Sequence, residues 1–182
     1  MSAGEVARTG PALDHVGISG RFNACFASRR PAATLLVGGA AEPVYLPRCG
    51  HRPALIRYTR DYARSALHEL AHWCLASPEA RTQQDYGLWY SPPPRTAPQQ
   101  ARFYAAEIPV QGLEMLLSLA CGIEFRFSAD NPGADGGPDR VTFERAVTAH
   151  CARLQRRGPG AAAETVLTLL NPRWRACPGV GP

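Results

Sequence analysis

The sequence predicts an α+β fold, organised as a single domain with a small β-sheet and packed helices. The chain has 182 residues, which is enough to bury one sizeable core and short for two ordinary domains. Short β-prone runs occur in the first third of the chain, and segments with apolar residues at helical spacing follow them. The composition is 45% hydrophobic and 19% charged, which is typical of a globular protein.

The first third of the chain is predicted to form one short helix and up to three strands. Residues 1–20 have weak periodicity and are expected to be a flexible leader. Phe22, Cys25 and Phe26 lie at helical spacing within residues 20–29. The runs TLLVGG and EPVYLP, separated by a Gly-rich turn, predict either a hairpin or two edge strands, and ALIRYTR predicts a third strand.

The rest of the chain is predicted to be mostly helical. Four helices are expected, at residues 60–76, 108–121, 140–157 and 161–171. The first ends before Pro78, and the second has Gly122 at its C-terminal cap. A long aromatic and Pro-rich loop of the kind that is often functional should separate these two helices. Residues 172–182 are expected to be a flexible tail, so the main domain spans residues 21–171.

Charge, cysteine and hydrophobic patterning exclude several classes of protein. No stretch reaches the length of a membrane span and the N-terminus lacks a signal-peptide pattern, so we expect a cytoplasmic protein without membrane contact. Six single cysteines without a C-x-x-C pair argue against a zinc ribbon or a redox dithiol. The net charge is +5, but no basic run exceeds two residues, which favours an acidic protein partner over direct nucleic-acid binding.

The segment SALHELAHWC carries the pattern H-E-x-x-H, with His68 and His72 four residues apart. On a helix these two side chains share one face, so their nitrogens can converge on one metal ion. A third ligand is needed, and a carboxylate from a later helix is the usual solution for zinc and for non-haem iron. Glu107 is the first candidate, expected at the start of the next helix, and Glu114 is the second.

The spacing of the motif is compatible with two chemistries. In a zinc peptidase Glu69 would act as the general base on a metal-bound water. In an iron oxygenase two histidines and one carboxylate leave open positions for dioxygen and substrate. The alternative without a metal is a pair of core histidines that are satisfied by hydrogen bonds. Glu107 would then only offset a helix dipole.

Six segments, in this order, are similar to the elongation factor P hydroxylase family over residues 21–171: RFNACF, EPVYLP, SALHELAHWC, DYGLWY, PQQARFYAAEIPVQGLE and DRVTFERAVTAH. The resemblance implies a non-haem, metal-dependent oxygenase that hydroxylates the modified lysine of elongation factor P, usually after a β-lysyl group has been added. It implies a zincin-like pair of metal-binding helices, with His68, His72 and Glu107 as ligands, iron(II) as the divalent metal and dioxygen as co-substrate. After Trp89 and Tyr90 the chain reads SPPPR, where the family tends to have a Pro-Asp-Gly turn.

A lysine hydroxylase must bind an ammonium group beside its metal. Tyr86, Trp89 and Tyr90 are candidates to line the approach of the lysine through cation–π contacts, although they also fit ordinary core aromatics. Asp85, Asp130 and Asp139 are candidates to pair with ammonium groups, although loop aspartates often cap helices or turns. We predict Glu69, Tyr86, Trp89 and Asp85 as catalytic residues.

Two other functions remain open at this stage. The first is an H-E-x-x-H zinc metallopeptidase with Glu69 as its base. The second is a non-catalytic module that binds the translation factor and keeps zinc only for structure. Neither function explains why so many segments outside the metal motif are similar to the hydroxylase family.

Overall fold

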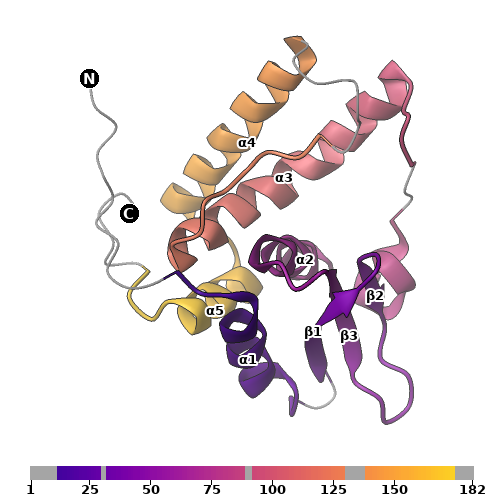
Figure 1. The fold of residues 1–182 in the computed structure, drawn as a ribbon, viewed down its shortest axis with the longest axis vertical. Helices are drawn as coiled ribbons and strands as arrows, with labels where there is room; N and C mark the ends of the chain where they lie inside the picture. The colour runs from indigo at the N-terminus through magenta and orange to yellow at the C-terminus, as the bar shows by residue number, and fades with distance from the viewer. Residues whose placement is uncertain (1–11, 30–31, 89–91, 130–137, 175–182) are drawn as a thin grey trace.

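A computed structural model describes residues 12–29, 32–88, 92–129 and 138–174, and its helices and strands form an α+β fold (Figure 1). The elements are α1 (His15–Phe26), β1 (Thr34–Ala40), β2 (Val44–Leu46), β3 (Ala54–Thr59), α2 (Ala63–Leu75), α3 (Ala97–Cys121), α4 (Pro138–Arg157) and α5 (Ala161–Leu170), with 3-10 turns η1 (Ala80–Thr82) and η2 (Gln84–Gly87). The expectation of one domain with a small sheet and packed helices is confirmed.

The sheet has the strand order β1-β3-β2, with β1 parallel and β2 antiparallel to β3. The expected hairpin between the first two strands is therefore wrong, and the alternative of two edge strands is right. The central position goes to β3, whose Ala54, Ile56 and Tyr58 are all buried. This alternation means that one face of β3 packs into the core, while β1 and β2 pair with its backbone on either side.

The first helix begins at His15, inside the segment that was expected to be a flexible leader. Asp14 caps it by accepting the Gly17 N–H at 2.7 Å, and Ile18 is fully buried. The cap was missed because a lone Asp is a weak signal without a long apolar stripe after it. Within the expected tail, Trp174 is also buried, while residues 175–182 lie outside the described part of the chain.

The side chain of Asn23 on α1 satisfies the outer edge of β1. Its Nδ2 donates to the Leu36 carbonyl at 3.0 Å, and its Oδ1 accepts the Leu36 N–H at 2.8 Å. Leu36 is only 1% exposed, so these backbone groups have no ready access to bulk water. Asn23 therefore takes the place of a neighbouring strand at this residue.

We expect Asn23→Ala to lower the free energy of unfolding by about 1 to 3 kcal/mol, because two buried backbone groups lose their partners. Urea denaturation followed by circular dichroism would measure the change. Val16→Ala, at a 61% exposed position on the same helix, is the control and should change stability by less than about 0.5 kcal/mol. An Asn23 variant as stable as this control would contradict the role assigned to the side chain.

Helix α3 begins at Ala97, well before the expected start near residue 108. Thr96 and Gln99 form a capping box, and a proline lies in the first turn, where its missing N–H costs nothing. Pro109 therefore lies inside the helix and not near its start. The consequence is that Glu107 lies in mid-helix, so it does not serve to offset a helix dipole at an N-terminus.

Helix α2 lies between the sheet and α3, and α4 runs beside α3 (Figure 1). The main core includes Phe22, Leu67, Leu70 and Leu117, which are all at most 1% exposed. A smaller cluster of Tyr104, Phe143 and Val147 joins α3 to α4. The order of sheet, α2 and α3 brings one face of α2 against α3.

Among the described residues, no helix combines the length and the apolar character needed to cross a membrane.

Candidate metal centre

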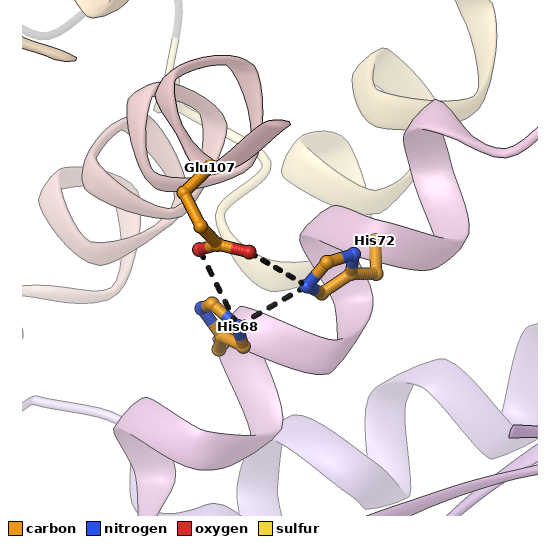
Figure 2. Close-up of side chains that lie close together, drawn as sticks. All are labelled: His68, His72 and Glu107. Carbon is orange, nitrogen blue, oxygen red and sulfur yellow. Dashed lines mark hydrogen bonds and ion pairs between the residues drawn. The ribbon is translucent and has the colours of Figure 1, made fainter. Parts of the chain in front are cut away.

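His68 and His72 lie one turn apart on α2, and Glu107 of α3 faces them (Figure 2). The two histidine Nε2 atoms are 3.2 Å apart. The Glu107 Oε1 lies 3.6 Å from His72 Nε2, and its Oε2 lies 3.9 Å from His68 Nε2. One ligand atom from each residue falls within 4.8 Å of the other two. The three residues that were predicted as ligands are therefore brought together.

The spacing of these atoms fits a divalent metal ion. Two ligand atoms that each lie about 2.1 Å from one ion are about 3.0 to 3.4 Å apart at ordinary coordination angles. The distance of 3.2 Å between the histidine nitrogens is within this range. A movement of the Glu107 carboxylate by roughly half an ångström would bring its oxygens into the same range. Two imidazoles and one carboxylate suit both zinc and iron(II).

Glu114 does not join this cluster but binds the far side of the His68 ring. Its Oε2 lies 2.9 Å from His68 Nδ1, and the residue is 6% exposed. Glu114 was expected as an alternative ligand. This expectation is not met, because its carboxylate contacts Nδ1 of His68, whereas Nε2 of His68 faces Glu107 and His72. A histidine held in this way presents its Nε2 to a metal in a defined orientation.

The two histidines differ in charge when no metal is bound. Burial opposes protonation of His68, but the hydrogen bond to Glu114 and the charges of Glu114 and Glu107 outweigh it and raise the pKa of His68 to about 10. Burial, and then the charge on His68, lower the pKa of His72 to about 3. His72 is therefore unprotonated at neutral pH and its Nε2 accepts from His68, whereas a metal would have to displace a proton from His68.

Glu69 follows His68 on α2 and lies outside the cluster of three ligands. Burial raises the pKa of Glu69 to about 7, with the nearby charge of His68 opposing the shift and that of Glu107 adding to it. A carboxyl group with this pKa exists in both protonation states at neutral pH. Glu69 is thus able to accept or release a proton beside the centre.

Three of the residues predicted to contact the substrate lie in the described part of the chain, and each has a different environment. Tyr86 is buried, stacks on Tyr45 at 4.2 Å between ring centroids, and lies nearly parallel to the His72 ring at 6.4 Å. Asp85 turns toward β2, where its Oδ1 accepts the Tyr45 N–H at 2.8 Å, as a turn aspartate does. Asp139 is exposed in the first turn of α4.

Three other candidates, Trp89, Tyr90 and Asp130, lie outside the described residues. Among the described residues, Tyr86 is therefore the predicted aromatic residue that lies beside a candidate metal ligand. Asp85 and Tyr86 both have positive φ angles, which is rare for residues other than glycine and marks η2 as a constrained turn.

Sequence reasoning did not single out Gln111, which is 1% exposed and donates a hydrogen bond to Glu107 Oε2 at 3.1 Å. The available signal was its spacing of four residues from Glu107, which places the two side chains on one helix face. That signal was missed because Glu107 was expected in the first turn of the helix, as an isolated candidate ligand.

The fold and this cluster define a single-domain α+β protein with a candidate centre of two histidines and one glutamate. The family model described as Elongation factor P hydroxylase matches residues 21–176. The chain is also 38% identical over 146 residues to the Elongation factor P lysine hydroxylase of Haemophilus influenzae, which covers 80% of each protein. The chain belongs to the elongation factor P hydroxylase family, as the resemblance of its segments indicated.

Proposed function

We propose that this chain is a metal-dependent hydroxylase that acts on the modified lysine of elongation factor P. Family membership supports the reaction and the substrate. The observation that carries the metal dependence is the convergence of His68, His72 and Glu107 from two packed helices. Because the proposed substrate is a translation factor, we also propose that the reaction takes place in the cytoplasm.

The proposed centre resembles a zincin in placing both histidines of H-E-x-x-H on one helix. Iron(II) bound there would supply the activation of dioxygen that insertion of oxygen into a C–H bond requires. Two imidazole nitrogens and one carboxylate would supply three ligands and would leave the remaining positions of the ion for dioxygen and the substrate. Burial of Glu107 keeps its carboxylate away from competing water.

We assign supporting roles to the remaining predicted residues. Glu69 is placed beside His68 and has a pKa of about 7, so it holds or moves a proton at its carboxyl group during the reaction. Tyr86 flanks the His72 ring, and Trp89 and Asp85 belong to the same stretch of chain. We propose that this stretch orients the lysine, by cation–π contact and by the negative charge of Asp85.

The net charge of +5 supports a transient encounter with an acidic protein substrate.

The test of the proposal is to incubate the iron-loaded chain with β-lysylated elongation factor P, dioxygen and a reductant, and then to weigh the modified peptide by mass spectrometry. A gain in mass of one oxygen atom is expected. An unshifted peptide, with iron confirmed in the protein, would contradict the proposal.

We expect no proteolysis from the zinc-loaded chain, because its family membership supports a hydroxylase rather than a peptidase. The assay is digestion of casein by the wild type and by Glu69→Gln, which removes the base that a peptidase would need. Casein fragments that appear with the wild type and disappear with Glu69→Gln would favour the peptidase. Fragments that persist in both would indicate a contaminating protease.

A further inference from the structure

The orientation of the Gln111 amide is set by the backbone of Ser128. The Ser128 N–H can only meet an acceptor and lies 3.1 Å from Gln111 Oε1, while the Ser128 carbonyl lies 2.8 Å from Gln111 Nε2. The two contacts together exclude the flipped amide, in which two donors and two acceptors would face each other. The remaining Nε2 proton therefore points to Glu107 Oε2, at 3.1 Å.

This contact has an energetic reason as well as a geometric one. Glu107 is 7% exposed, and a buried carboxylate is costly unless hydrogen bonds satisfy its oxygens. Gln111 satisfies Oε2 and leaves Oε1 facing His72 Nε2. With Ser128 as its anchor, the amide cannot rotate away from Glu107 without breaking two further hydrogen bonds.

Glu114 does for His68 what Gln111 does for Glu107. Its carboxylate contacts Nδ1 of the ring at 2.9 Å and so leaves Nε2 directed at the other two ligand atoms. Gln111 and Glu114 follow Glu107 on α3 at four and seven positions, which is one face of the helix. That face lies against the histidines of α2.

We infer that Gln111 and Glu114 form a positioning layer for the metal centre, in which Gln111 orients Glu107 and Glu114 orients His68. The inference rests on the proposed metal-dependent function. Neither residue belongs to the cluster of three ligand atoms, and each contacts one of its members, so each acts through a proposed ligand. Hydrogen bonds of this kind tune metal affinity and restrict the geometry of the ligands.

The chain offers a matched control on the same helix. Gln100 is 8% exposed, and its Nε2 donates to the Ala129 carbonyl at 3.1 Å, next to the residue that anchors Gln111. It therefore ties α3 to the same segment of chain without a hydrogen bond to a proposed ligand among the described residues. Loss of this tie tests the structural contribution of a buried glutamine separately from the positioning of Glu107.

The experiment measures metal affinity in the full chain, with wild type, Gln111→Met, Glu114→Gln and Gln100→Met. Competition with a fluorescent chelator gives the dissociation constant for zinc and for iron(II). We expect Gln111→Met and Glu114→Gln to bind metal about 10- to 100-fold more weakly than the wild type, and Gln100→Met to bind it within about 2-fold. The visible absorption bands of the cobalt(II)-loaded protein should shift in the first two variants and not in the third.

The outcomes separate this inference from the proposed function. Wild-type affinity and an unchanged cobalt spectrum in both Gln111→Met and Glu114→Gln would overturn the positioning layer and leave the metal-dependent hydroxylase standing. Equal weakening in all three variants would also overturn it, because a general loosening of α3 would then explain the loss. A wild-type chain that binds no divalent metal would overturn both. Melting temperatures without metal show which variants are folded, and Glu114→Gln, which keeps the shape of the side chain, guards against loss of the fold.

Discussion

Replacement of His72 by alanine should abolish hydroxylation of elongation factor P. The change removes one of the two proposed nitrogen ligands, so a bound ion would keep only one imidazole and one carboxylate. His72 is the proposed ligand that is already unprotonated at neutral pH, because burial and the charge on His68 lower its pKa to about 3. We expect no product mass under conditions in which the wild type converts its substrate completely, and metal content reduced well below one ion per chain.

His51→Ala is the matched control for this variant. His51 is exposed in the connection between β2 and β3, so its replacement removes a histidine without touching the cluster. It should keep wild-type activity and metal content. Product formed by His72→Ala at the rate of His51→Ala would rule out His72 as a ligand. A far-ultraviolet circular dichroism spectrum equal to that of the wild type shows that any loss in His72→Ala is not a loss of the fold.

Leu70→Ala should cause the largest loss of stability among the changes considered. Leu70 lies between the two histidines in the sequence, but it points into the core, where it is 0% exposed. Truncation of a fully buried leucine removes transfer free energy and leaves a cavity, at a cost of about 2 to 5 kcal/mol. The measurement is the shift of the urea midpoint, with the slope of the transition checked for two-state behaviour.

Leu119→Ala serves as the comparison, since Leu119 is 47% exposed on α3. It should change stability by less than about 0.5 kcal/mol. If Leu70→Ala were as stable as Leu119→Ala, the face of α2 opposite the histidines would not be packed as described. Because α2 carries both histidines, we also expect weaker metal binding by Leu70→Ala near its unfolding midpoint.

The helix that carries the metal motif was predictable because its information is local. The apolar stripe of Leu67, Leu70 and Ala71 predicted a helix, and the helix repeat then places His68 and His72 on one face. The family could also be recognised, because short segments such as EPVYLP and SALHELAHWC keep their order along the chain. Neither inference needs to know how distant segments pack.

The errors arose where a weak local signal competed with a strong one. The expected start near residue 108 would place Pro109 in the first turn, but a proline in mid-helix is tolerated when the rest of the helix is packed, as α3 is against α2 and α4. The capping box at Thr96 was the better signal. The strand order was also not predictable, because β1 and β2 are close in the chain and yet both pair with β3.

By itself the sequence determined the family, the α+β class and the pair of histidines on one helix, because periodicity and motif order are properties of neighbouring residues. The tertiary structure alone decided which oxygens face those histidines. The carboxylate of Glu107 faces both histidines, Glu114 contacts Nδ1 on the far side of the His68 ring, and Gln111 donates a hydrogen bond to Glu107. The physical reason is that the register of α3 against α2 follows from side-chain packing between segments far apart in the chain, which no local pattern encodes.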